Sequence, residues 1–304
     1  MMVRKLAFVG GILVILAQCA APSFGEESTV FAPAFYDAGS VGREPPKLHV
    51  FPVAGQLFTI RLPFQIGRLA ASPDGKVLYG SRFFDPSEPN TGLYKVEFGP
   101  TRAAKVPGSE GLASVNGIAA SSTKVVVSAG YLTNGFVSRC GLYELSLASG
   151  DVHKILSNPD CKYTSSWYSM GLSPDSRRII AVREHRLELI DTETGAVQPL
   201  GNDFNYAAWS PDGRWIAALD GNSDHTVLID ALTLKKRKTL PPSEVIWSPD
   251  SRHILASEPH ARCPPDFGTL ELIDIDSGKA SIIRSSTCQI SMLVFGWINA
   301  VTSQ

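Results

Sequence analysis

The chain of 304 residues carries 28 basic and 29 acidic side chains, and its formal net charge at pH 7 is −1. This balance gives no electrostatic reason to expect a nucleic acid or an anionic membrane surface as a partner. With 44% hydrophobic residues, the chain is long enough to form one large all-β domain.

The first segment predicts export. Arg4 and Lys5 precede an apolar run over residues 6–17, which is the pattern of a secretory signal peptide. The run is shorter than the roughly 20 residues that span a bilayer, so a cleaved signal is favoured over a membrane anchor. Small residues predict cleavage between Gly25 and Glu26. We therefore expect residues 1–25 to be a signal peptide and the mature protein to be periplasmic or secreted.

A repeated turn sequence follows further along the chain. "AAWSPDGRWIAALD" (207–220) has a Ser-Pro-Asp-Gly turn between two apolar runs too short for helices, which predicts two strands and a tight turn. "LAASPDGKVLYGS", "GLSPDSRRIIAV" and "VIWSPDSRHILAS" are further copies, and "IAASSTKVVVSAG" is a degenerate copy without Pro-Asp-Gly. The turn serines are Ser72, Ser121, Ser173, Ser210 and Ser248. Repeats of this length indicate a propeller or a solenoid.

A second hairpin follows each of these turns, as in "RLELIDTETGAVQPL" and "TLELIDIDSGKASII". Each repeat therefore contains four antiparallel strands, A to D, which is the content of a propeller blade. "KLHVFPVAGQLFTIRLP" is interpreted as a C–D hairpin and "QISMLVFGWINAV" as an A–B hairpin. We expect an all-β, six-bladed β-propeller over residues 47–304, whose last blade takes two strands from each terminus. Residues 26–46 are expected to form an N-terminal extension.

The "WSPDG" turns and the strands that follow them resemble the WD40-like (PD40) repeats of the TolB family. The resemblance covers nearly all of the chain after the signal peptide, and it implies a propeller that binds other proteins in the periplasm. TolB also has an α/β domain ahead of its propeller, and we expect none here because residues 26–46 alone precede the first expected strand. The same repeats occur fused to hydrolases, but the sequence has no G-x-S-x-G nucleophile motif.

Four cysteines remain after the predicted cleavage, which suits two disulfides in an oxidising compartment. Composition leaves three pairings open. Both cysteines of each candidate pair fall on the face formed by the B–C and D–A loops of one blade, which favours Cys140–Cys161 and Cys263–Cys288. Cys19 raises the separate question of lipidation, although a small residue is expected where Gln18 stands.

The B–C and D–A loops are long, irregular and aromatic, whereas the A–B turns are short and uniform. Binding is therefore expected on the loop side, although the loops can also simply connect blades. The aromatic candidates there are Phe83, Phe84, Tyr131, Phe136, Tyr163 and Trp167. A second candidate set is polar and lies near the mouth of the central channel: Arg68, Asn116, Asn205, Tyr206 and Glu244.

Two functions from different classes fit these residues. The first is a monomeric, non-enzymatic binding propeller without a cofactor, whose partner is another periplasmic or envelope protein. The second is a metal-dependent lactonase or hydrolase, similar to six-bladed gluconolactonases, with Glu244, Asn116 and Asn205 as oxygen ligands of a channel cation. The six histidines are scattered, so no zinc site is expected. The run Lys235–Lys238 is interpreted as a solvated turn.

Overall fold

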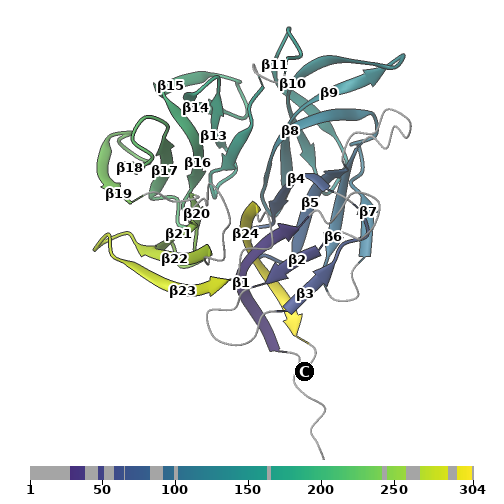
Figure 1. Cartoon of the computed structure of the whole chain (residues 1–304). Helices are drawn as coiled ribbons and strands as arrows, with labels where there is room; N and C mark the ends of the chain where they lie inside the picture. Colours follow the sequence, from purple (N-terminus) through teal and green to yellow (C-terminus); the bar gives the residue numbers. More distant parts are fainter. Residues whose placement is uncertain are drawn as a thin grey trace, which may run out of the picture.

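A computed structural model describes residues 28–37, 47–50, 58–64, 66–82, 92–98, 102–162, 166–241, 245–257, 268–286 and 293–302. The regular elements within these ranges are β-strands (Figure 1). They are β1 (Ser28–Asp37), β2 (Lys47–Val50), β3 (Phe58–Arg61), β4 (Ile66–Ala71), β5 (Val77–Arg82), β6 (Leu93–Glu97), β7 (Arg102–Lys105), β8 (Leu112–Ala120), β9 (Lys124–Thr133), β10 (Phe136–Ser146), β11 (Val152–Ser157), β12 (Ser169–Leu172), β13 (Arg178–Arg183), β14 (Arg186–Asp191), β15 (Val197–Gly201), β16 (Phe204–Trp209), β17 (Trp215–Asp220), β18 (Thr226–Asp230), β19 (Lys236–Leu240), β20 (Ile246–Trp247), β21 (His253–Ser257), β22 (Gly268–Asp274), β23 (Ala280–Ser286) and β24 (Leu293–Thr302). No helix in the same ranges has the length and apolar character needed to cross a membrane.

Sets of four consecutive strands form blades one to five: β4–β7, β8–β11, β12–β15, β16–β19 and β20–β23. In each blade the strands are called A to D in chain order. The remaining strands form one further sheet, in the order β24-β1-β2-β3, which we call the terminal sheet. The prediction of an all-β propeller with four-stranded antiparallel blades is confirmed.

The A strands of successive blades lie side by side. β8 contacts β4 and β12, and β16 contacts β12 and β20. β24 contacts both β20 and β4, so the terminal sheet lies between the fifth blade and the first (Figure 1).

The predicted division of strands between the termini is wrong. Three strands of the terminal sheet come from the N-terminal side and one from the C-terminal side. β1 lies within the segment expected to be an extension, and it pairs with β2 on one edge and β24 on the other. Residues 293–302 form one continuous strand instead of a hairpin. Pro33 within β1 obscured this strand, because proline is rare in the interior of a sheet.

The Ser-Pro-Asp turns are stabilised by their own side chains. In the third blade, the Ser173 hydroxyl donates to Asp175 at 2.6 Å, and the same carboxylate accepts the backbone N–H of Arg177 at 3.1 Å. Both bonds recur in the first, fourth and fifth blades, so these aspartates act locally, within their own turns. The hydrogen bond from Ser173 and that from the backbone lower the pKa of Asp175.

The C–D turns of blades three to five use an acidic side chain in a second way. Asp191 accepts from the backbone N–H of Thr194 at 2.7 Å and from its hydroxyl at 2.8 Å. Asp230 and Asp274 make equivalent bonds, and we call the three residues the C–D turn aspartates. Backbone hydrogen bonds are the largest cause of the lowered pKa of each carboxyl.

The hydrophobic core consists of separate clusters between adjacent blades. Trp209 packs between the third and fourth blades, and Trp247 packs between the fourth and fifth. They are 7% and 6% exposed. Leu48 of the terminal sheet packs against Leu78 and Val96 of the first blade. From the terminal sheet through to the fifth blade, adjacent sheets therefore bury apolar surface against one another.

Candidate binding surface

The B–C and D–A connections form one face of the ring, here called the loop face, and the A–B and C–D turns form the opposite turn face. The second blade carries the longest B–C hairpin in the described part of the chain. β9 and β10 contain 10 and 11 residues, whereas the B and C strands of the other four blades contain five to seven. β10 pairs with β11 only from Gly141 onward, so residues 136–140 extend past the D strand (Figure 1).

A tight turn ends this hairpin and leaves an aromatic side chain in solvent. Asn134 and Gly135 both have positive φ, 51° and 81°, which matches the two-residue hairpin turn favoured by the twist of β-strands. Phe136 follows this turn and is 78% exposed. A single exposed hydrophobic side chain is common on protein surfaces. At the tip of a projecting hairpin, however, such a side chain is placed to insert into a partner.

The base of the hairpin is covalently fixed. Cys140 and Cys161 form a disulfide with a Cα–Cα distance of 5.2 Å, which joins β10 to the D–A loop after β11. Gly130 on the neighbouring strand makes room for it, because a Cβ there would lie 2.7 Å from the Cys140 sulfur. The second expected pair, Cys263 and Cys288, lies outside the described residues, and its pairing stays a prediction.

An aromatic and basic cluster supports the same hairpin. The rings of Tyr131 and Tyr143 meet edge to face at 5.2 Å, and the Arg139 guanidinium lies 4.8 Å from the centre of the Tyr131 ring. The Tyr143 hydroxyl donates to the backbone carbonyl of Arg139. Burial raises the pKa of both tyrosines, so both phenols stay neutral at physiological pH. Tyr131 therefore packs within the hairpin whose tip carries Phe136.

Trp167 is not an exposed anchor, and its assignment to the binding surface is wrong. It is 1% exposed and packs among apolar residues of the second and third blades. Its indole Nε1 donates to the carboxylate of Glu188 at 2.9 Å. Arg183 donates to the other Glu188 oxygen at 3.0 Å and lies 4.7 Å from the centre of the indole ring. Sequence reasoning missed this group because its three members come from a loop and two different strands.

Two of the channel-mouth residues, Asn116 and Asn205, have side-chain partners in loops. The Asn116 amide donates to Ser166 at 3.1 Å, and the Asn205 carbonyl oxygen lies 3.0 Å from His185 Nδ1. Both amides thus have a side-chain partner in a loop outside their own strand. Arg68 is half-buried, and Tyr206 is 49% exposed.

Four candidates of the loop face and channel mouth lie outside the described residues: Phe83, Phe84, Tyr163 and Glu244. No group of three or more His, Cys, Asp or Glu side chains in the described ranges is arranged to hold a metal ion.

No protein-family model and no curated protein matches the sequence. Among solved structures, the chain is similar to TolB from Acinetobacter baumannii, with a TM-score of 0.64 and 17% identity over 90% of this chain and 67% of that one. It is also similar to a chain of a nidogen/laminin complex, with a TM-score of 0.58 and 12% identity over 89% of this chain and 98% of that one. A provisionally assigned 6-phosphogluconolactonase from Bacteroides fragilis gives a TM-score of 0.51 and 13% identity over 87% of both chains. At these identities the likeness establishes the fold, a TolB-like β-propeller.

Proposed function

We propose that the protein is an exported, non-enzymatic propeller that binds another protein through its loop face. The projecting β9–β10 hairpin carries this proposal, because it places the 78% exposed Phe136 on a support fixed by the Cys140–Cys161 disulfide. A rigid aromatic anchor loses little conformational entropy on binding, which is the property of interface hot spots. The likeness to a chain of the nidogen/laminin complex adds an example of this fold in a protein assembly.

The residues near Phe136 indicate what the partner surface must offer. Arg139 is exposed beside Tyr131, and arginine and tyrosine are enriched in interface cores. A partner with an apolar pocket and an adjacent carboxylate would complement Phe136 and Arg139 together. A periplasmic or envelope protein is the proposed source, since the sequence predicts cleavage between Gly25 and Glu26.

The proposal includes a closed ring of six blades in which the terminal sheet is the sixth. The contacts of β24 with both β4 and β20 support this count. It also includes the second disulfide, Cys263–Cys288, which would join the B–C loop of the fifth blade to the segment after its D strand, as Cys140–Cys161 does in the second blade.

A photo-cross-linking amino acid at position 136 tests the binding face in the cell that naturally makes the protein. Leu232 is the matched control, because it is 91% exposed and lies in a C–D turn on the opposite face. We expect one discrete protein adduct from position 136 and none from position 232. With the adduct identified, Phe136→Ala should weaken binding by about 2 kcal/mol, or about 30-fold. Equal labelling at both positions, or no adduct at 136, would contradict the proposal.

A metal-dependent lactonase remains the second candidate, supported by the fold likeness to the provisionally assigned 6-phosphogluconolactonase. Its oxygen ligands would include Asn116, Asn205 and Glu244. Purified protein assayed with lactones and added Ca²⁺ or Mg²⁺ separates the two functions. Turnover that requires the cation and disappears in Glu244→Gln would establish the enzyme and reject the binding-only proposal.

A further inference from the structure

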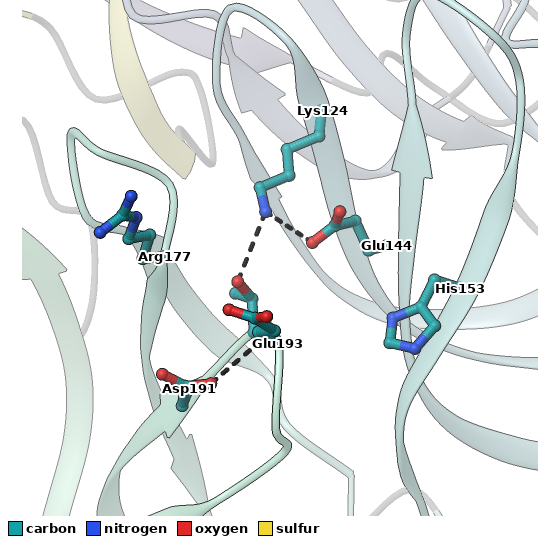
Figure 2. A pocket seen from close by; sticks show the side chains of 7 residues that line it. Lys124, Glu144, His153, Arg177, Asp191 and Glu193 are labelled. Carbon is teal, nitrogen blue, oxygen red and sulfur yellow. Dashed lines mark hydrogen bonds and ion pairs between the residues drawn. The ribbon is translucent and has the colours of Figure 1, made fainter.

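The turn face holds a polar cavity of 390 Å³ at the boundary between the second and third blades (Figure 2). Seven residues line it: Lys124, Glu144, His153, Arg177, Asp191, Thr192 and Glu193. The first three belong to the second blade and the other four to the A–B and C–D turns of the third. This cavity is remote from the loop face, so its function does not depend on the proposed protein partner.

The cavity coincides with the degenerate copy of the repeated turn. In the regular turns a backbone hydrogen bond joins residues five apart, as from Ser72 N to Val77 O. In the second blade the corresponding bond joins residues only three apart, from Ser121 N to Lys124 O. The second blade therefore lacks counterparts of the turn proline and aspartate. In the third blade the turn proline covers the next turn, because Pro174 lies 3.3 Å from the position that a Cβ on Gly213 would take.

The floor of the cavity is an ion pair within the second blade, and its lysine also reaches the third blade. Lys124 Nζ lies 2.6 Å from a Glu144 carboxylate oxygen and 3.4 Å from the hydroxyl of Thr192. The side chains of Lys124 and Glu144 are 17% and 24% exposed, so the two opposite charges compensate each other in a partly buried environment. A ligand must therefore be recognised mainly by the remaining charged groups.

Those remaining groups have opposite signs. Arg177 and Glu193 are exposed, and neither forms an ion pair with another described residue. Asp191 also lines the cavity, and the hydrogen bonds of its turn lower the pKa of its carboxyl and keep it charged. Figure 2 shows Arg177 and His153 on opposite sides, with Glu193 and the Lys124–Glu144 pair between them.

This charge set selects against ligands of a single sign. Three carboxylates outnumber the two permanent cations, which disfavours phosphates and other polyanions, while a purely cationic ligand would meet Arg177 and Lys124. We propose that the cavity binds a small zwitterion of dipeptide size, with its carboxylate toward Arg177 and its ammonium group toward Glu193 and Asp191. The volume lies at the lower end of the range for small-molecule sites, which suits a ligand of that size.

Calorimetric titration with L-alanyl-L-alanine tests the proposal directly. Three forms of the same dipeptide isolate each charge: N-acetylated, C-amidated, and capped at both ends. We expect a dissociation constant of about 1 mM or lower for the zwitterion. Each single cap should weaken binding at least tenfold, and the double cap should abolish it.

Two variants and one control assign the binding to this cavity. Arg177→Gln should weaken the zwitterion and the N-acetylated form, and Glu193→Gln should weaken the zwitterion and the amide. Arg214→Gln is the control, because Arg214 holds the same exposed turn position in the next blade and lies outside the cavity. Equal binding of the doubly capped dipeptide, no binding of the zwitterion, or an equal loss in the control variant would overturn the proposal.

Discussion

Replacing Trp167 with Phe should destabilise the protein without removing a binding contact. The indole of Trp167 is 1% exposed, and its N–H donates to Glu188, which is 3% exposed. Phe keeps most of the packed ring but leaves one Glu188 carboxylate oxygen without this donor. Hydrogen bonds to charged groups contribute about 1.5 to 3 kcal/mol, so we expect a loss of about 2 kcal/mol in the free energy of unfolding.

The size of the effect makes it measurable by thermal and urea unfolding followed by circular dichroism. For a domain of this length, about 2 kcal/mol corresponds to a fall in Tm of roughly 4 to 8 °C. Trp167→Ala also removes the ring, and buried aromatic truncations cost about 3 to 5 kcal/mol in packing alone. Phe136→Ala is the control and should leave Tm nearly unchanged, because Phe136 is 78% exposed. An unchanged Tm for Trp167→Phe together with weaker partner binding would show that Trp167 is an exposed anchor after all.

Three further perturbations separate the other stabilising features. Replacing Cys140 and Cys161 with Ser removes a link across 21 residues and should lower the free energy of unfolding by about 3 kcal/mol relative to the oxidised parent protein, measured by urea unfolding. The reduced parent protein is the control and should be as unstable as the variant. The C–D turn aspartates have lower pKa values in the folded protein than in the unfolded chain. Their contribution to the free energy of unfolding is therefore complete above about pH 4 and is lost as the pH falls through the pKa values of the folded state. A variant with Asn at all three positions should therefore show a smaller loss of stability between pH 5 and pH 3, and an unaltered acid transition would contradict this. Deleting residues 28–37 should lower the midpoint of urea unfolding, because β24 would lose its hydrogen-bonded neighbour in the terminal sheet. An unchanged midpoint would show that β1 is dispensable.

Blades with local signals were predictable from the amino-acid sequence. Ser173 and Asp175 stabilise their turn through bonds within a few residues, so the turn motif carries the information for its own structure. The strands on either side alternate or are wholly apolar, which separates them from helices. The terminal sheet carries no such local signal, because the conformation of β1 depends on β24 at the far end of the chain.

The candidate site was less predictable because burial depends on distant residues. Trp167 follows a polar loop and resembles an exposed aromatic, but Glu188 and Arg183 on later strands enclose it. Phe136 was identified correctly as a loop-face aromatic, whereas the length of its hairpin became clear only from strand register. The turn-face cavity has one signal in the sequence, the missing Pro-Asp-Gly after Ser121, but that signal alone indicates only a degenerate repeat.

The pairing of β1 with β24 has a consequence for how the chain folds. Ser28 lies opposite Thr302, so the first described strand cannot find its partner until the last one has been synthesised. Blades one to five can form from neighbouring segments, but the terminal sheet must wait for the two most distant described segments to meet, which is the slow, entropically expensive kind of contact. Until then β1 and β24 leave unpaired edges open to other chains. Mutations near the two ends should therefore affect the yield of folded protein and its tendency to aggregate more than the properties of the finished ring.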